Sequence, residues 1–526
     1  MRTFDRWLTI AFFVLVTGEL IDTRQIYQHA EWYKTPGNPG VKIRLTKKGI
    51  NHLKTVGVRL LNEQISTLSG YSTQFAISQP GLEGQVFLRD VRVLHYNPPQ
   101  ISVVNFLPPR YMILGLENMD ISLAGAFYGT GGPFQVEGFV DGSITGMTVA
   151  LTAEFATSVD GTMGVQVPNC STVITHSHFN IDPQGPMGPL VKTLEHLIED
   201  NSPRLFQKLV RTDFQEHFKD FRLVDSPVIK KFVSDFVRGM YINNLHISDP
   251  IVTNEYFETQ QRGEIRYTSN DENTPFYPRP MYTDNESNRM LYFYGSDYIF
   301  NSLLYHAYQT NKLSIKLNKN NISKKYRGFL ATSCGESGTS GDFTSSICVG
   351  KLIPPIAQEY PNNYYLMAYQ ISSSTVMLVL LCCQVRMLQQ NTKPRILTYV
   401  DDHGQEKQIM VSSADGQADV LLAAQNGHLG GDLKLNRLSV RLHRTSLAGM
   451  DPSSIEQLAP LAKTFIGPQL SQALKKGIPF PLKDSITFVD PQLTTRDGFI
   501  ELATDFVLNE NAMRAKIHET FANINI

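Results

Sequence analysis

The sequence predicts an α+β protein made of two similar barrel-like units. The chain has 526 residues, more than one hydrophobic core usually holds, so at least two domains are expected. Each half has an amphipathic helix, then many strands, then another helix, which favours two units of the same kind. Between the halves lies a polar, proline-rich stretch at 268–281, TSNDENTPFYPRPM, which has the composition of a linker.

The first element is a short strand followed by a long helix. Apolar residues occupy every second position in 41–45, the period of a half-buried strand. From Thr46, a plausible N-cap, the pattern becomes helical. The apolar stripe consists of Ile50, Leu53, Gly57, Leu60, Leu61 and Ile65. Nearby basic residues form a modest surface that suits anionic headgroups, although a solvated helix face is the simpler interpretation: Arg44, Lys47, Lys48, Lys54 and Arg59.

The rest of the first half alternates between strand and helix signals. Short strands punctuated by Gly and Pro favour a meandering antiparallel sheet. They are expected at 84–95, 100–106, 111–116, 119–127, 134–139 and 143–157. Two apolar stripes at helical spacing follow at 187–198 and 205–221, and strands return at 241–267.

The second half repeats this order of elements. A helix begins at Ser296, which is a possible cap, and carries Leu303, Leu304 and Ala307 on its stripe. A region rich in strands spans 313–442, and a second amphipathic helix spans 454–475. Strands at 485–489 and 499–507 close the chain.

Composition indicates a secreted, folded protein with no nucleic-acid partner. The net charge of −1 lacks the excess of cations that nucleic acid attracts. Residues 1–18 have a positive start, an apolar core and small residues at the end, the pattern of a signal peptide. Glycosylation sequons that agree with secretion begin at Asn169, Asn285 and Asn321.

Five cysteines are too few for a scaffold held mainly by disulfides. Cys334 and Cys348 flank a polar Gly/Ser-rich loop and are the expected pair. Cys382 and Cys383 are adjacent in a strand, where buried thiols are the simple interpretation.

Motifs for catalysis or metal binding are missing from the sequence. We find no nucleophile elbow, zinc-protease motif, P-loop or dinucleotide fingerprint. His176 and His178 put two imidazoles on one face of a strand, but no third ligand is assignable, so we expect no metal. We therefore expect no enzyme activity, no catalytic residue and no cofactor.

The order of several short motifs resembles one known family. These are Asn38-Pro39-Gly40 with the strand and helix after it, the stretch 138–170 with GSITGM, LYFYGSDYIFN at 291–301, GDLKLNRL at 431–438 and LKKGIPFP at 474–481. Together they resemble the family of bactericidal/permeability-increasing protein, lipopolysaccharide-binding protein, cholesteryl ester transfer protein and phospholipid transfer protein. The resemblance covers nearly all of residues 38–507.

This resemblance implies a boomerang of two elongated antiparallel barrels, each wrapped on a long helix and joined by a central β-sheet. It implies barrels at 38–240 and 282–484, central strands at 241–267 and 485–507, and a tail at 508–526. Each barrel of that kind encloses an apolar tunnel for acyl chains. The residues we expect to face lipid are Ile50, Leu53, Leu60, Leu61 and Leu194 in the first half, and Phe300, Leu303, Leu304 and Phe465 in the second.

The sequence departs from the family at two places. Members that bind lipopolysaccharide carry a basic hairpin near the tip of the first barrel, whereas residues 124–135, AGAFYGTGGPFQ, contain no Lys or Arg. The family also pairs the counterpart of Cys170 with a downstream cysteine, and residues 171–333 contain none. Lipopolysaccharide recognition by that hairpin is therefore disfavoured.

The leading interpretation is a secreted, monomeric lipid-binding and lipid-transfer protein that contacts membrane or lipoprotein surfaces transiently. It would hold phospholipid or another acyl lipid in two apolar tunnels. The alternatives are recognition of bacterial surface lipid, an enzyme acting on lipid, and a carrier with a permanently bound lipid. The apolar residues Met513, Ile517 and Phe521 of the tail would cover a tunnel mouth or a membrane surface, or else belong to a frayed end.

Overall fold

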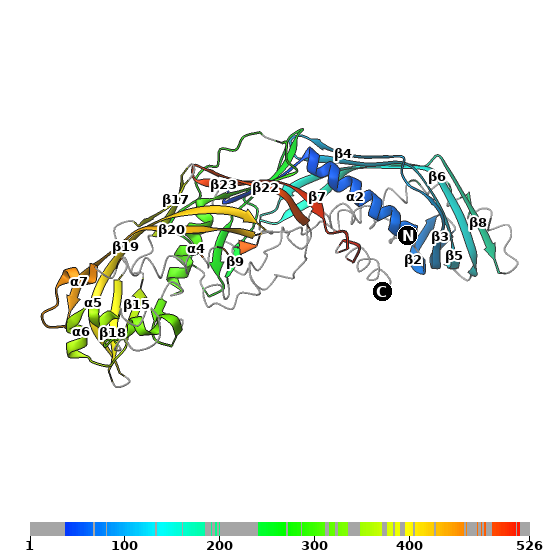
Figure 1. Cartoon of the computed structure of the whole chain (residues 1–526). Coiled ribbons are helices and arrows are strands. Elements are labelled where there is room, and N and C mark those ends of the chain that lie inside the picture. Colours follow the sequence, from blue (N-terminus) through cyan, green and yellow to red (C-terminus); the bar gives the residue numbers. More distant parts are fainter. Residues whose placement is uncertain are drawn as a thin grey trace.

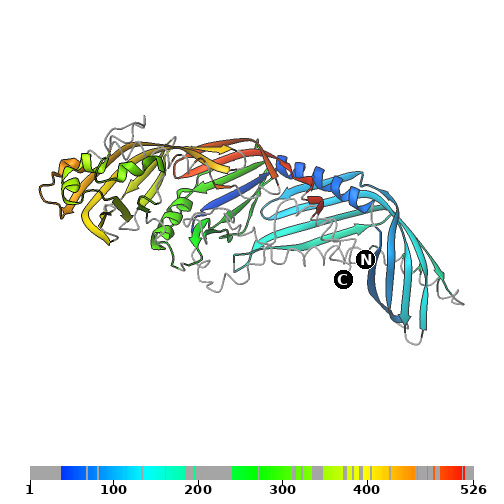
Figure 2. The same cartoon turned by 60° about the horizontal axis from the view of Figure 1, so that its bottom comes forward.

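The computed structural model is mostly β-structure with few helices. It describes most of residues 37–184, 240–334, 348–456 and 486–515, with short gaps, and isolated residues between these ranges. The molecule is elongated (Figure 1). Strands of the N-terminal half gather at one end and strands of the C-terminal half at the other, and a sheet containing both lies between them (Figure 2).

The central sheet has six strands in the order β10-β11-β1-β13-β23-β22. Its strands are β10 (Ile251–Val252), β11 (Tyr256–Gln261), β1 (Val41–Thr46), β13 (Leu291–Ser296), β23 (Phe499–Leu508) and β22 (Ile486–Arg496). The two middle strands, β1 and β13, come from different halves of the chain. The sheet therefore joins the halves through backbone hydrogen bonds.

The repeated order of elements appears in the sheet as an approximate two-fold arrangement. β1 and β13 pair antiparallel, with Ile43 opposite Phe293. β1 leads into helix α2 (Lys47–Ile65), and β13 leads into helix α4 (Asp297–Gln309). Because β1 and β13 run in opposite directions, their C-terminal ends lie at opposite ends of the strands. Helices α2 and α4 therefore extend in opposite directions, one toward each end of the molecule (Figure 1).

The central sheet differs from the expected one in its membership. Two strands expected there, β9 (Met240–Asn243) and β12 (Glu264–Tyr267), form a separate two-stranded sheet. β1 and β13, which the sequence analysis placed in the barrels, take the middle positions. All six residues of β13 are buried, so this strand needs covered faces and a partner on each edge.

The proline-rich stretch is packed against the central sheet. Asn38 Nδ2 donates to the Pro278 carbonyl (3.1 Å), Lys42 Nζ to the Met281 carbonyl (3.2 Å) and Arg44 Nη1 to the Asp284 carbonyl (2.6 Å). The first two bonds attach the segment to Asn38 and to Lys42 of β1, and the third attaches Arg44 of β1 to Asp284, just beyond the segment. The segment links the halves, but it is a cover over the sheet and not a free spacer.

The N-terminal half has a seven-stranded antiparallel sheet. It consists of β2 (Tyr71–Gln79), β3 (Leu82–Asn97), β4 (Ile101–Leu107), β5 (Tyr111–Gly131), β6 (Phe134–Thr157), β7 (Met163–Val173) and β8 (His176–Pro183). Two predicted pairs of short strands are in fact single long strands, β5 and β6. The apparent break in β5 is a bulge, where Asn118 has a φ of 57°.

The C-terminal half has an eight-stranded sheet and several short helices. Its strands are β14 (Ile315–Leu317), β15 (Tyr365–Gln370), β16 (Val376–Leu381), β17 (Gln384–Gln389), β18 (Arg395–Asp402), β19 (Gln405–Gln425), β20 (His428–Thr445) and β21 (Ile478–Pro479). The helices are η2 (Lys324–Leu330), α5 (Val349–Leu352), α6 (Pro354–Glu359) and α7 (Pro452–Glu456). The expected disulfide between Cys334 and Cys348 is present, with Cα atoms 5.4 Å apart.

The two expected helix caps have different outcomes. The Gly49 amide donates to Thr46 Oγ1 at 3.3 Å, so Thr46 caps α2 as predicted. Ser296 Oγ is buried and makes no hydrogen bond with any described residue, so the predicted cap of α4 is wrong. Ser296 still pairs with Phe499 in the sheet, which holds it as the last residue of β13. Of the expected helices at 187–198, 205–221 and 454–475, most residues lie outside those described.

Candidate functional site

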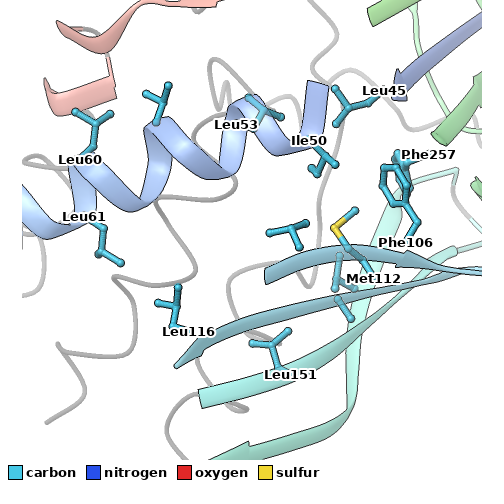
Figure 3. Packing of buried hydrophobic residues seen from close by; sticks show 14 of the residues in the cluster. Leu45, Ile50, Leu53, Leu60, Leu61, Phe106, Met112, Leu116, Leu151 and Phe257 are labelled. Carbon is cyan, nitrogen blue, oxygen red and sulfur yellow. The ribbon is translucent and has the colours of Figure 1, made fainter. Parts of the chain in front are cut away.

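The candidate site is the apolar layer between helix α2 and the sheet of the N-terminal half. Figure 3 shows Ile50 and Leu61 on the side of α2 that faces the strands carrying Phe106, Met112, Leu116 and Leu151, and Leu53 and Leu60 on the other side of the helix. Ile50, Leu53, Leu60 and Leu61 are each between 0% and 3% exposed. They belong to one cluster of buried residues, here called the α2 cluster. Its strand members include Phe106, Met112, Leu116, Leu151 and Phe257.

Local sequence explains why α2 sits so close to its neighbours. A Cβ on Gly49 would lie 2.4 Å from the Met290 carbonyl oxygen, so only glycine fits at this point of the first turn. Farther along, burial lowers the pKa of His52, whose ring packs edge-on against Phe506 with centroids 5.6 Å apart. His52 is therefore a neutral ring at pH 7.

The basic surface expected around α2 is largely used in internal pairs. Arg44 is buried and paired with Glu258, so its assignment to a headgroup surface is wrong. Lys48 Nζ lies 2.9 Å from Asp505 Oδ2, and Arg59 Nη1 lies 3.0 Å from Glu63 Oε1. A solvated, ion-paired helix face accounts for these residues.

The carboxylate of Asp505 holds several groups beside this helix. It accepts hydrogen bonds from Lys48, from the Met290 amide and from Arg289. Burial alone would raise the pKa of Asp505, but these bonds together lower it below its usual value. Asp505, a residue of β23, therefore links this strand both to α2 and to the residues just before β13.

The start of the C-terminal tail packs against α2. Met513 is 2% exposed and belongs to the α2 cluster. Arg514 Nη2 lies 2.7 Å from Glu63 Oε2, and Arg59 Nη2 lies 2.5 Å from Glu510 Oε1. The first turn of the tail is thus folded onto the candidate site. Ile517 and Phe521 lie outside the described residues.

The lipid-facing residues expected in the second half are not brought together. Phe300 packs beside Ile500, whereas Leu303 packs beside Ile265 and Tyr267 in a separate cluster. The side chain of Leu304, together with Leu194 and Phe465, lies outside the described part of the structure. The described residues of this half therefore show no counterpart of the α2 cluster around α4.

Buried polar contacts attach α4 to β12. The Ile265 amide donates to Ser302 Oγ at 3.0 Å. His306 Nε2 lies 2.9 Å from Glu264 Oε1, and both side chains are at most 1% exposed. Both helices make apolar and polar contacts, but the polar contacts of α4 with β12 are buried, whereas the ion pairs of α2 are partly exposed. The two helices are alike in topology and different in chemistry.

The edge strand β8 is held by two carboxylates from a helical segment. Glu195 Oε1 accepts a hydrogen bond from the Ile181 amide at 2.9 Å, and Glu199 Oε1 accepts one from the Phe179 amide at 3.1 Å. Val191, one helical turn earlier, packs against Phe127 and Ile181. At this edge of the sheet, the two glutamate side chains accept the backbone hydrogen bonds that a neighbouring strand would otherwise accept.

The two histidines weighed as a metal pair, His176 and His178, are both exposed. His178 Nδ1 lies 3.3 Å from Glu199 Oε1. Among the described residues, no group of three His, Cys, Asp or Glu side chains is arranged to hold a metal ion. In the same part of the chain, no helix has the length and apolar character needed to span a bilayer.

Sequence reasoning missed the strand side of the α2 cluster. Met112, Leu116 and Leu151 lie in segments that were predicted as strands but not as part of a site. Their alternation gave the signal that one face of each strand is apolar. The packing partner of that face could not be deduced from the alternation.

Comparison with known proteins places this arrangement in a family. A family model described as the C-terminal domain of the LBP / BPI / CETP family matches residues 239–508. The chain belongs to the LBP / BPI / CETP family. This confirms the resemblance seen in the short motifs. The matched region contains the central strands β11, β13, β22 and β23 and the sheet of the C-terminal half.

Individual LBP / BPI / CETP relatives match most of the chain at low identity. Bactericidal permeability-increasing protein of Rattus norvegicus is 22% identical over 480 residues, covering 89% of this chain and 93% of its own. Lipopolysaccharide-binding protein of Homo sapiens is 21% identical over 487 residues, covering 89% and 93%. Cholesteryl ester transfer protein of Homo sapiens is 21% identical over 349 residues, covering 61% and 65%.

A solved structure is also similar to this chain. The crystal structure of a lipopolysaccharide binding protein aligns with 90% of this chain and 99% of its own, at 18% identity and a TM-score of 0.44.

Proposed function

We propose that this protein is a secreted lipid-binding and lipid-transfer protein that performs no covalent chemistry. Its ligand is phospholipid or another acyl lipid, held by apolar contacts in each half. The α2 cluster is the observation that carries the proposal, because it is a continuous apolar layer between a helix and a curved sheet. Membership in a family with relatives named for binding lipopolysaccharide or transferring cholesteryl ester supports it.

Simple energetics support binding by acyl chains alone. An acyl chain inserted between α2 and the sheet would lie beside Ile50 and Leu61 of the helix and the strand residues of the α2 cluster. Each buried methylene contributes about 0.8 kcal/mol, so a chain of a dozen or more carbons needs no charged anchor. Specificity then depends on the length and width of the apolar layer.

The tip of the N-terminal sheet argues against headgroup recognition of lipopolysaccharide there. Residues 124–135 form the end of the β5–β6 hairpin, where Gly131 pairs with Phe134. This hairpin contains no Lys or Arg. Phosphate groups are bound strongly by charge-assisted hydrogen bonds from such residues. Binding through acyl chains is therefore the mode that these residues favour.

The proposal includes the expected architecture and processing of the chain. Each half forms an elongated barrel around its helix, with the central sheet joining the two in a boomerang, and the mature protein begins after residue 18 and is a monomer. Asn169 and Asn285 are exposed, which suits glycosylation, and Asn321 lies outside the described residues. Membrane or lipoprotein surfaces are the donors and acceptors of the lipid.

Native mass spectrometry followed by lipid extraction tests the function. We expect acyl lipid to co-purify with the wild type and to be depleted in Leu61→Trp, which fills the apolar layer. Thr55→Trp, on the exposed face of the same helix, is the control and keeps its lipid. Transfer of labelled phospholipid between vesicles then separates a transfer protein from a carrier. A lipid-free wild type that binds lipopolysaccharide tightly would overturn the proposal.

A further inference from the structure

A row of exposed cations follows strand β20 in the C-terminal half. Lys434, Arg437, Arg441 and Arg444 are all exposed, and His443 lies beside them. In the described part of the structure, no ion pair or hydrogen bond of these four side chains is found. Charges in a folded protein are commonly paired or dispersed, so four unpaired cations on one strand are a distinct surface feature.

Two β-bulges place these four cations on one face. In a regular strand, Lys434 and Arg437 would point to opposite faces, as would Arg441 and Arg444. The pairing between β19 and β20 shifts by one residue in each interval, between Gln417 and Ala418 and between Val411 and Ser412. As a result, all four cations lie opposite odd-numbered residues of β19, which share one face. The two bulges thus bring all four cations to one face, although the three-residue intervals in the sequence would otherwise divide them between two faces.

The opposite face of β20 is committed to the protein core. Leu438, Val440 and Leu442 lie opposite even-numbered residues of β19 and pack in the cluster that contains Ile353 and Ile356. The four cationic side chains are therefore directed away from this core, while Val411 and Ser413, opposite Arg444 and Arg441, are buried on the cationic face. The same face also carries three acidic residues: Asp415 and Asp419 of β19 and, opposite Leu421, Asp432 of β20, which pairs with Lys475. Asp419 accepts a hydrogen bond from Asn436 and not from Lys434.

An exposed leucine lies on the same face. Leu421 is 74% exposed and occupies an odd-numbered position of β19, in line with Asp419. Cations on an edge strand also discourage edge-to-edge pairing of sheets. That role explains one or two lysines, but it explains neither the two bulges that align the charges nor an exposed apolar side chain beside them. A cationic face with an apolar side chain suits the interface of a lipid bilayer.

We propose that this face of β19 and β20, the β20 cationic face, docks the protein on membranes rich in anionic phospholipid. Each Lys or Arg near such a surface raises the membrane partition coefficient of the protein by up to about fivefold. A zwitterionic surface gives no such increase. Leu421 enters the headgroup region while Lys434, Arg437, Arg441 and Arg444 contact phosphate and carboxylate groups. The inference goes beyond the proposed function, because docking requires no lipid in the interior.

Vesicle sedimentation with the full-length protein tests the inference. Vesicles of phosphatidylcholine alone are compared with vesicles that contain 30% phosphatidylserine, a composition chosen for the assay as roughly that of an anionic leaflet. We expect binding to the anionic vesicles only, weakened in high salt because screening shortens the range of the attraction. Arg437→Gln with Arg441→Gln should lower the partition coefficient by about tenfold. Leu421→Ser should lower it by severalfold.

The control removes the same charge from the other half. Arg89→Gln with Arg92→Gln neutralises two exposed arginines of β3 and should leave vesicle binding unchanged. Equal binding of the wild type to both vesicle types, or equal loss in both double variants, would overturn the inference. Retention of the wild type on heparin without binding to anionic vesicles would also overturn it and assign the face to an acidic polysaccharide. Interior lipid content, measured in parallel, reports separately on the proposed function.

Discussion

Arg44 and Glu258 form an ion pair across the neighbouring strands β1 and β11, with Arg44 Nη2 and Glu258 Oε2 2.8 Å apart. Their side chains are 2% and 3% exposed. The guanidinium also lies over the ring of Tyr256, 4.0 Å from its centroid, and donates to the Asp284 carbonyl. The pair thus connects the middle of the central sheet to Asp284, just beyond the proline-rich cover.

Breaking this pair should destabilise the protein strongly. Glu258→Gln leaves the buried guanidinium of Arg44 without its counter-charge. We expect the free energy of unfolding, measured in urea, to fall by about 3 kcal/mol. Lys48→Gln removes the exposed pair with Asp505 and should cost less than about 1 kcal/mol. Equal losses in the two variants would contradict the importance given to burial.

A buried histidine should make stability fall in mild acid. Burial lowers the pKa of His246 to about 4, from the 6.5 that is usual for an exposed histidine. Above pH 6.5 the ring is neutral in both states, whereas between pH 6.5 and 4 the unfolded chain binds a proton that the folded protein rejects. Stability is therefore lost as the pH falls, by about 2 kcal/mol at pH 5. The free energy of unfolding, measured in urea at pH 7.5 and pH 5, should fall by about 2 kcal/mol less in His246→Leu than in the wild type.

The carboxylates on β8 should control protection of its backbone. Glu195→Ala removes the acceptor of the Ile181 amide, and we expect hydrogen exchange in residues 176–183 to accelerate by about tenfold. Glu195→Gln keeps an oxygen acceptor and should give an intermediate rate. Unchanged exchange in the alanine variant would show that the strand edge is held by packing around Val191.

The disulfide should stabilise the C-terminal half specifically. Replacing Cys334 and Cys348 by Ala opens a bridge with a sequence separation of 14, and we expect a loss of about 3 kcal/mol. The bridge anchors the residue that precedes α5, whose Val349 packs with Leu330 and Ile353. Tryptic digestion below the unfolding midpoint should therefore cut this half first. Simultaneous cleavage of both halves would contradict a local effect.

Sequence patterns predicted elements better than their partners. The change from a two-residue to a helical period at Thr46 located the end of β1 and the start of α2, because both periods are strong there. The break at Asn118 suggested two strands, since a bulge and a strand end look alike in a one-dimensional pattern. Membership of β1 and β13 in the central sheet depends on pairing between distant segments, which no local pattern encodes.

The candidate site shows the same division. The stripe of α2 predicted Ile50, Leu53, Leu60 and Leu61 as one apolar face, and the structure buries all four together. For α4, a similar stripe separated into different clusters, because Ser302 and His306 bond to β12. Apolar spacing predicts which residues are buried, whereas the partner element determines what they are buried against.

The position of β1 has a consequence for the order in which the newly made chain can fold. Its partners in the sheet lie from 210 positions later, for Thr46 with Tyr256, to 254 positions later, for Val41 with Gly295. At typical rates of synthesis, β1 waits on the order of ten seconds or more for these strands to be made. During this interval the alternating strand β1 and the apolar face of α2 are exposed together. Chaperone contact with residues 41–65 during synthesis is therefore expected to be longer than with strands that pair locally, such as β5 and β6.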